Sequence, residues 1–216
     1  MRGLSKLSPV TSTILLVSSG LAILYWLSRD SAQPKRSSYS GINQIKATKS
    51  EILKNAQFLS QQDSETKFVL VEYGDYQCEP CRQVDIKLKK VLASCDGKIA
   101  LCFRNYPLSA IHPLAFEAAL VAQSSKDKAQ FEKIHAAFYE GPLRSRQDIE
   151  AIKAKFGIKI QGFAFKSVQD DIAVAKKAGI NSTPSLFLCA LSGVVYEITD
   201  LDEVADFVNE ALRKKP

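Results

Sequence analysis

The chain has 216 residues, of which 46% are hydrophobic, and a formal net charge of +6 at pH 7. This length and apolar content suffice for one medium-sized domain with a hydrophobic core, together with appendages. Residues 1–36 hold five basic residues and one acidic residue, so most of the positive charge lies there and the rest of the chain is close to neutral. A nearly neutral domain argues against a nucleic-acid-binding surface.

The stretch from Leu7 to Ser28 contains 22 residues without a charged side chain. That length suits a helix that spans a bilayer, with Tyr25 and Trp26 at the interface. A cleaved signal peptide is the alternative, but no small-x-small pair follows the apolar run cleanly. We therefore expect residues 1–28 to be a membrane anchor, with the remaining domain exported to a periplasmic, luminal or extracellular compartment where disulfides persist.

The residues after the anchor are polar at first and then become helical. Residues 29–47 begin with Ser, Pro and basic side chains and are predicted to be a polar tether. Residues 48–61 place apolar side chains at helical spacing after Thr48 or Ser50, either of which can cap a helix. This helix opens the predicted domain, residues 48–216.

The next segment predicts a strand followed by a helix. Residues 67–73 form a continuous apolar run, which is typical of a strand buried on both faces. Glu72 is the exception, because a buried carboxylate must raise its pKa or find a partner. Apolar residues then recur at intervals of three and four from Cys81 to Cys95, which predicts an amphipathic helix of about four turns.

The remainder predicts one more strand, a long helical block, a hairpin and a last helix. Residues 99–108 are typical of a strand, and helical patterns fill nearly all of residues 112–179. Residues 185–199 contain two strands joined as a hairpin. In the last helix we expect Asp200 to be the cap and Glu203 to complete a capping box. Helices that cover a small mixed sheet make an α/β fold.

Cys78 and Cys81 stand three positions apart at the start of a predicted helix. Pro80 suits the first turn of that helix, so Cys78 lies at or just before its N-terminus. There the helix dipole and the free N–H groups stabilise a thiolate, which is the nucleophile of disulfide exchange. Cys81 faces the core one turn later and is placed to attack a mixed disulfide on Cys78 and release the client.

Two other uses of the cysteines stay open. A zinc site would use Cys78, Cys81, Cys95 and Cys102, but an apolar-striped helix separates the two halves, and neither half resembles a zinc-binding knuckle. A purely structural disulfide between Cys78 and Cys81 would close too short a loop to stabilise the fold much. We therefore expect a redox-active pair and no metal site.

Four motifs, taken in chain order, carry a resemblance to a known family. They are VEYGDYQCEPC, FRNYPL, HPLAFEAALVAQ and GINSTPSLFL. Over about residues 66–213 the chain resembles the thioredoxin superfamily, and more closely its exported branch similar to the bacterial disulfide oxidoreductase DsbA. The resemblance implies a thioredoxin fold with an inserted helical subdomain at about residues 109–179, and the one predicted N-terminal transmembrane helix that precedes this α/β domain lies outside the resemblance.

The resemblance also implies a role for each candidate site residue. Cys78 would be the attacking cysteine and Cys81 the resolving one. Thr183 and Pro184 match the family's cis-proline loop, which pairs with a bound client peptide. Glu72 matches the buried acid that relays protons at the resolving thiol.

The activity that these roles imply is disulfide exchange with cysteine-containing client proteins. No cofactor is needed, because the cysteine pair itself carries the two electrons. To turn over as a disulfide donor, the protein would need a membrane redox partner such as a DsbB- or VKOR-like oxidase. An exported reductase or isomerase supplied by an electron donor is one alternative, and a tethered module that binds clients without turnover is another.

The dipeptide between the two cysteines departs from the strongly oxidising members of the family. It is Glu79-Pro80 in place of Pro-His, so no imidazolium helps to stabilise the Cys78 thiolate. The negative charge of Glu79 should raise the pKa of Cys78. Both changes predict a weaker disulfide donor.

Three cysteines and two histidines remain. Cys95 and Cys102 are candidates for a second disulfide, with two buried free thiols as the alternative. Cys189 is predicted to be a small core residue. His112 and His135 are too isolated to indicate a metal site, and we expect structural roles for both.

Overall fold

The computed structural model describes residues 39–54, 57–60 and 62–214. The predicted anchor at residues 1–28 lies outside the described residues. Within these ranges, the helices are all too short or too polar to cross a bilayer.

The described residues form one six-stranded sheet with the order β1-β6-β5-β3-β4-β2. The central strands β3 (Phe68–Gly74) and β4 (Ile99–Asn105) are parallel, and every other neighbouring pair is antiparallel. The remaining strands are β1 (Ile42–Ile45), β2 (Gln57–Phe58), β5 (Ser185–Ala190) and β6 (Val195–Ile198). The parallel pair needs a crossover connection, and helix α3 (Glu79–Ser94) provides it.

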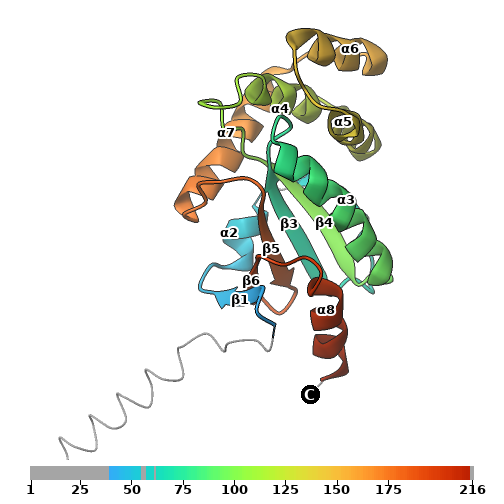
Figure 1. Ribbon diagram of the computed structural model, residues 1–216, viewed down its shortest axis with the longest axis vertical. Helices are drawn as coiled ribbons and strands as arrows, with labels where there is room; N and C mark the ends of the chain where they lie inside the picture. Colours follow the sequence, from blue (N-terminus) through green and yellow to red (C-terminus); the bar gives the residue numbers. More distant parts are fainter. Residues whose placement is uncertain (1–38, 55–56, 61, 215–216) are drawn as a thin grey trace, which may run out of the picture. The chain divides into compact units, whose positions relative to one another are not determined.

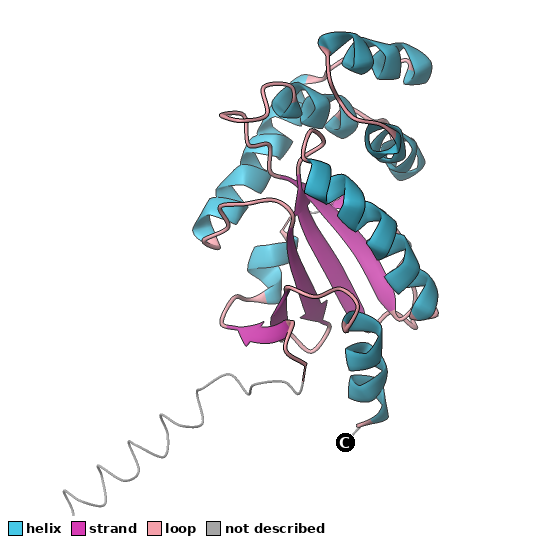
Figure 2. Ribbon diagram, viewed as in Figure 1, coloured by secondary structure: helices cyan, strands magenta, loops and turns pink. Residues whose placement is uncertain are grey.

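Helices cover both faces of this sheet (Figure 1, Figure 2). On one face, α3 and α8 (Val204–Arg213) pack against alternate residues of β3, such as Phe68 and Leu70. On the other face, α2 (Lys49–Leu53) and α7 (Gly162–Lys177) pack against the residues between them, such as Val69 and Val71. Because strand side chains alternate between faces, β3 and β4 are buried along their whole length.

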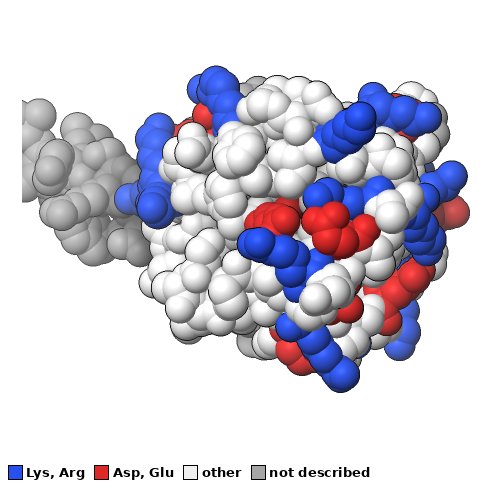
Figure 3. Space-filling view, turned by 90° about the horizontal axis from the view of Figure 1, so that it is seen from above, with Lys and Arg blue, Asp and Glu red and all other residues white. Residues whose placement is uncertain are grey.

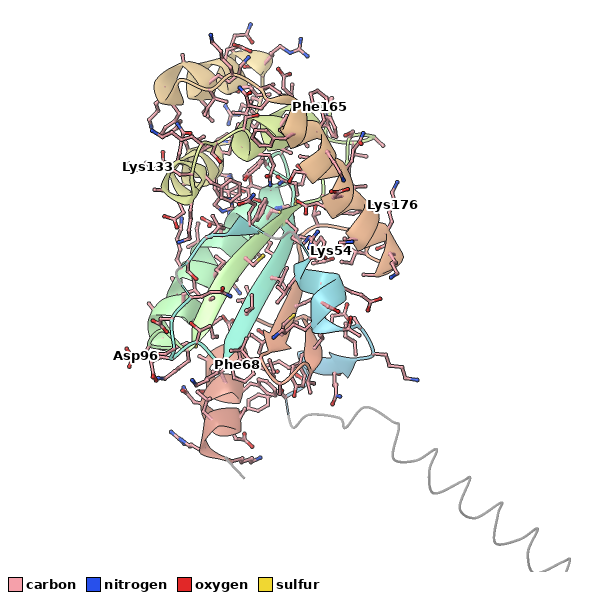
Figure 4. The ribbon with its side chains drawn as sticks, turned by 180° about the vertical axis from the view of Figure 1, so that it is seen from behind. Lys54, Phe68, Asp96, Lys133, Phe165 and Lys176 are labelled. Carbon is pink, nitrogen blue, oxygen red and sulfur yellow. The ribbon has the colours of Figure 1, made fainter. Side chains whose placement is uncertain are left out.

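The predicted helical insertion is confirmed between β4 and β5. It consists of α4 (Ala115–Gln123), α5 (Lys128–Glu140), α6 (Arg146–Phe156) and α7. Figure 4 shows Phe68 at one end of β3, and Lys133 and Phe165 of the insertion beyond its other end. Helices α4, α5 and α6 thus cover the end of the sheet where α3 begins, and a third core cluster joins them to Cys78, Cys81 and Phe103.

The predicted helix over residues 48–61 is too long. Thr48 does cap α2, in a capping box with Glu51, but the helix ends at Leu53. Gln57 and Phe58 instead form β2, which pairs with Phe103 and Cys102 on the outer side of β4. Pairing with the exposed edge of β4 therefore outweighs the helical spacing of the sequence.

The predicted tether at residues 29–47 is also too long, because β1 lies inside it. Ile42 is fully buried in the core and pairs with Ile198 of β6. The polar composition of the segment as a whole conceals four residues that add a strand to the sheet.

The predicted start of the last helix is wrong in its capping. Glu203 is itself the N-cap residue of α8, and its side chain makes no capping bond there. Its carboxylate instead accepts hydrogen bonds from the Gly41 N–H at 2.8 Å and the Ser40 hydroxyl at 3.1 Å. Asp200 accepts a hydrogen bond from the Asp202 N–H at 2.9 Å. Glu203 therefore holds the start of β1 against α8.

Candidate active site

Cys78 stands at the N-cap of α3, as the sequence predicts, with Pro80 in the first turn. Its N–H donates to the Asp75 carbonyl at 3.1 Å, and a carboxylate oxygen of Asp75 accepts from the Gln77 N–H at 2.7 Å. Both contacts fix the loop between β3 and α3. The Cys78 sulfur in turn accepts the Cys81 N–H at 3.4 Å, which satisfies one of the free N–H groups of the helix start.

The surroundings of Cys78 favour its thiolate. The Cys81 thiol donates a hydrogen bond to the Cys78 sulfur, and the effect of this hydrogen bond on the Cys78 pKa is larger than the opposing effect of burial. With help from the Thr183 side chain and the Cys81 N–H, this lowers the pKa of Cys78 to about 6. The Glu79 carboxylate, which we expected to raise the pKa of Cys78, binds Arg82 and Gln83, and its charge is not among the main causes that set this pKa.

Cys81 has the opposite character, although it is only one turn away. Its side chain is fully buried, and its hydrogen bond to Cys78 and its burial raise the pKa of its thiol far above the ordinary range. All five cysteines are free thiols, so the structure describes the reduced form of the pair.

The peptide bond between Thr183 and Pro184 is cis, and it lies beside the cysteine pair. The Cys78 thiol donates to the Thr183 carbonyl at 3.5 Å. The Thr183 hydroxyl is buried and makes no other hydrogen bond among the described residues, so it is free to donate to the Cys78 thiolate. The fold thus joins the two motifs, which are about a hundred residues apart in sequence.

A groove borders Pro184 on the side of α3. It has a volume of about 460 Å³ and runs between Val84 and Lys87 of α3, the start of β5 at Leu186, and the loop that leads to Leu201. An extended peptide that reached Cys78 past Pro184 would enter this groove.

Glu72 is fully buried. Burial is one condition for the role predicted for it, a buried acid that relays protons at Cys81. Glu72 lies on β3 in register with Phe103 and Leu186, and it shares a strand face with Phe68 and Leu70, on the side that α3 covers. Neither of its carboxylate oxygens has a hydrogen-bond partner among the described residues. Burial, together with the charges of Asp85 and Cys78, raises its pKa well above the ordinary value.

Asp75 and His112 form a part of the site that was not predicted from the sequence. The buried Asp75 carboxylate accepts from the Leu108 N–H at 2.8 Å and lies 2.8 Å from His112 Nδ1. These contacts clamp the loop before α3 to the loop before α4. The acid and the histidine lie 37 positions apart, and spacing alone does not connect them.

Cys95 and Cys102, the candidates for a second disulfide, are both free thiols in the structure, which agrees with the alternative of two buried free thiols. Cys95 packs in the core cluster under α3 and α8, whereas Cys102 packs in the cluster on the opposite face of the sheet. The turn between them reverses the chain, but β4 then points Cys102 away from α3. Cys189 is a buried core residue, as predicted.

The same separation argues against the four-cysteine zinc site, because Cys78, Cys81, Cys95 and Cys102 lie in three different core clusters. Among the residues that the structure describes, no three His, Cys, Asp or Glu side chains are grouped so that they could hold a metal ion.

Figure 3 shows basic and acidic side chains interspersed over the face of the insertion.

Comparison with solved structures shows the fold. The chain is similar to the catalytic domain of Proteus mirabilis ScsC, with a TM-score of 0.62 and 21% identity over 76% of this chain and 94% of that one. It is similar to the thiol-disulfide exchange protein alpha-DsbA2 from Wolbachia pipientis, with a TM-score of 0.59 and 20% identity over 76% and 91%. A periplasmic thioredoxin-like protein from Salmonella enterica serovar Typhimurium matches with a TM-score of 0.62 and 17% identity over 76% and 95%.

Among curated proteins, the chain is similar to part of the Na(+)/H(+) antiporter NhaA 1 of Mycolicibacterium vanbaalenii. The two are 28% identical over 131 residues, which are 56% of this chain and 21% of the antiporter. The chain thus spans about a fifth of the length of the curated relatives it matches.

The family described as Thioredoxin matches residues 59–209, well over half of the chain. The match begins just after β2 and covers the strands β3, β4, β5 and β6, the cysteine pair, the inserted helices, the cis-proline loop and most of α8. The chain therefore belongs to the thioredoxin family.

Proposed function

We propose that this protein exchanges disulfides with cysteine-containing client proteins through Cys78 and Cys81, outside the cytoplasm and mainly as a disulfide donor. The observation that carries the proposal is the opposite character of two thiols one turn apart: the pKa of Cys78 is lowered to about 6, whereas that of Cys81 is raised. A thiol with a low pKa is a thiolate at neutral pH and a good leaving group.

In the donating direction, a client thiolate attacks the Cys78 sulfur of the oxidised pair. A bond between the client and Cys78 forms, the bond between Cys78 and Cys81 breaks, and Cys81 leaves as a thiolate. Because the pKa of Cys81 is high, this thiolate takes up a proton at once, and the buried carboxyl of Glu72 is the nearby acid that supplies it.

A second client thiolate then attacks the client sulfur of the mixed disulfide. The client disulfide forms and Cys78 leaves as a thiolate, so the client loses two electrons that the cysteine pair gains. The two client thiols release one proton each to solvent, and Glu72 regains its own from solvent, so one proton is released net for each client disulfide formed. Cys81 thus ends the first step as a protonated thiol, and Cys78 ends the second step as a thiolate. Each is the protonation state that the surroundings of that cysteine favour.

The stabilised Cys78 thiolate also favours the donating direction over the reducing one. A stable thiolate stabilises the reduced pair, which makes the oxidised pair a better oxidant. This revises the expectation from Glu79, whose charge Arg82 neutralises.

Turnover requires a partner that reoxidises the pair, and we propose a membrane oxidase of the DsbB- or VKOR-like kind. The predicted anchor at residues 1–28 would keep the domain near such a partner. The periplasmic origin of the similar Salmonella protein supports an exported domain.

The proposal is tested by trapping a client on Cys78. In Cys81→Ser the resolving thiol is absent, so a peptide with one activated cysteine should accumulate as a mixed disulfide, whereas Cys78→Ser should form none. Cys189→Ser added to Cys81→Ser is the matched control, because it removes another buried thiol and should leave trapping unchanged. Equal trapping by Cys81→Ser and Cys78→Ser would refute exchange through Cys78.

The binding-module alternative makes a different prediction for Cys78→Ala. A protein that only holds clients would keep its affinity and its effect on them in this variant. An exchanger would lose all disulfide transfer to a reduced client protein.

A further inference from the structure

A buried polar cluster lies under α3, where this helix packs against β3 and α5. Its side chains come from two stretches that are distant in sequence, residues 72–85 and 135–139: Glu72, Tyr76, Cys81, Asp85, His135 and Tyr139. Three of its atoms, both Glu72 oxygens and Tyr139 Oη, have no hydrogen-bond partner among the described residues, and His135 Nε2 has only a long contact of 3.5 Å with Asp85. Unpaired polar atoms are rare in a protein interior, and their concentration next to a reactive thiol calls for a functional explanation.

Asp85 is the acid of this cluster that has charged and polar partners. It follows Cys81 by four positions on α3, so both side chains point to the buried face of the helix. One carboxylate oxygen binds Lys89 Nζ at 2.6 Å, and the other lies 3.5 Å from His135 Nε2. Burial disfavours the charged carboxylate, but the contacts with His135 and Lys89 outweigh burial and lower its pKa.

His135 reaches this site from the inserted helices. Its ring is buried against Phe103 and Tyr139, and its Nδ1 lies 3.2 Å from the Tyr76 hydroxyl. Burial lowers its pKa, so the ring is neutral and carries one N–H. The Asp85 carboxylate can only accept, so the N–H belongs on Nε2, and the Tyr76 hydroxyl then donates to Nδ1.

Glu72 lies on the face of β3 that α3 covers, Asp85 lies on the buried side of α3, and the charge of Asp85 acts on Glu72. After burial itself, the charge of Asp85 is the largest cause of the raised pKa of Glu72, ahead of Cys78. The charge of Glu72 in turn raises the pKa of Cys81. When two carboxyl groups share a buried site, the better-solvated one ionises and the other keeps its proton. Asp85 is the carboxyl group that ionises, because its contacts with Lys89 and His135 lower its pKa.

We propose that Asp85 and His135 are positioning residues for the proton transfer at Cys81, and that they act by keeping Glu72 protonated until Cys81 leaves as a thiolate. The inference rests on the proposed function. The helical insertion then has a part in the chemistry, because His135 of α5 holds the charge that prepares Glu72.

The charged and titratable groups that face the cluster are few. From α3 they are Cys78, Cys81, Asp85 and Lys89; from the loop after β3, Asp75 and Tyr76; and from α5, His135 and Tyr139. Both tyrosines have raised pKa values through burial, so they stay neutral. Among these groups, Asp85 alone places a negative charge near Glu72 that a mutation can remove without touching the cysteines or the loop that holds them.

The test measures the titration of Glu72 directly, from the ¹³C chemical shift of its carboxyl group in the reduced full-length protein. Asp85→Asn should lower the midpoint of this titration by about one pH unit or more, because a like charge is lost. Asp202→Asn is the matched control: Asp202 also pairs with a lysine of α3, Lys87, but it is exposed and should leave the midpoint unchanged.

Two further comparisons guard against a variant that fails to fold. Lys89 has an exposed side chain, so Lys89→Gln should fold and lower the Glu72 midpoint by a smaller amount, whereas Lys90→Gln on the same helix should not. His135→Leu should also lower the midpoint, and His135→Gln, which retains an N–H donor, should restore it at least in part.

The kinetic readout is the rate at which glutathione opens the oxidised pair, corrected for the glutathione thiolate at each pH. In wild type this rate should decline with rising pH as Glu72 ionises. In Asp85→Asn the decline should begin at a lower pH, displaced by the same number of pH units as the Glu72 midpoint. An unmoved Glu72 midpoint in folded Asp85→Asn would overturn the inference while leaving disulfide exchange intact. Failure of the wild-type pair to open at all would instead overturn the proposed function, whatever the titration shows.

Discussion

Replacing Cys81 by alanine should raise the pKa of the Cys78 thiol. In the reduced protein, the hydrogen bond from the Cys81 thiol is the largest cause that lowers the Cys78 pKa from 9.0 to about 6. At pH 7 a thiol of pKa about 6 has roughly ten thiolates for each protonated thiol, whereas one of pKa about 9 has roughly one thiolate for a hundred thiols. The Cys81→Ala variant should lie between these limits, with its midpoint at least about one pH unit above that of wild type.

The assay is the rate of alkylation of Cys78 by iodoacetamide as a function of pH, read by the mass of the labelled peptide. Cys81→Ser is the matched variant, because its hydroxyl still donates a hydrogen bond to the Cys78 sulfur, and its midpoint should stay nearer to that of wild type. The Cys81 N–H and the Thr183 side chain remain in both variants, so neither should return fully to the ordinary thiol value. Equal midpoints for wild type and Cys81→Ala would refute the assignment of the thiolate stabilisation to Cys81.

Three further predictions concern stability. The pKa of Cys78 is about 6 in the folded protein and near 9 in the unfolded protein. Between these two pH values the free energy of unfolding of the reduced protein, measured relative to Cys78→Ser, should therefore rise by roughly 1.4 kcal/mol per pH unit. A difference between the two proteins that does not change with pH in urea titrations would contradict this. Arg104→Met should lower the free energy of unfolding by about 3 to 5 kcal/mol, because it leaves the buried Asp171, 2.8 Å from the guanidinium, without its partner; a loss below about 1 kcal/mol would show that the pair is dispensable. Gly74→Ala should cost about 1 to 3 kcal/mol, since its methyl group would lie 2.4 Å from the Phe103 ring, and an unchanged melting temperature would count against it.

The parts of the fold that sequence predicts well are those that local chemistry determines. The N-terminus of α3 is one, because Pro80 restricts where the helix can begin and thereby places Cys78 at the cap. The buried strand β3 is another, because an unbroken apolar run has few other uses in a soluble domain. The burial of Glu72 follows from its place in that run.

The errors lie where a distant segment competes with a local pattern. Gln57 and Phe58 leave their helical register to pair with β4, and Ile42 leaves a polar segment to pair with β6. Glu203 has the right spacing for a capping box but binds Gly41 instead. Each of these contacts spans dozens of residues or more, and no spacing rule reports them.

The site follows the same division. The cysteine pair and the Thr183-Pro184 loop can be found from motifs, whereas the partners that tune them cannot. Asp85 looks like an ordinary polar position of an amphipathic helix, and His135 looks isolated, until packing of α5 against α3 brings them to 3.5 Å. A faint signal does exist, because Asp85 lies on the same helical face as Cys81.

The most direct test of the central claim is the reduction potential of the Cys78–Cys81 pair. The domain beginning at Ser37 would be equilibrated in glutathione buffers and read by thiol alkylation and mass. The account predicts a reversible two-electron couple with a potential between about −120 and −200 mV, in the range of disulfide donors. A value near about −270 mV would contradict the donating direction, and the absence of a reversible couple between these two cysteines would contradict the account as a whole.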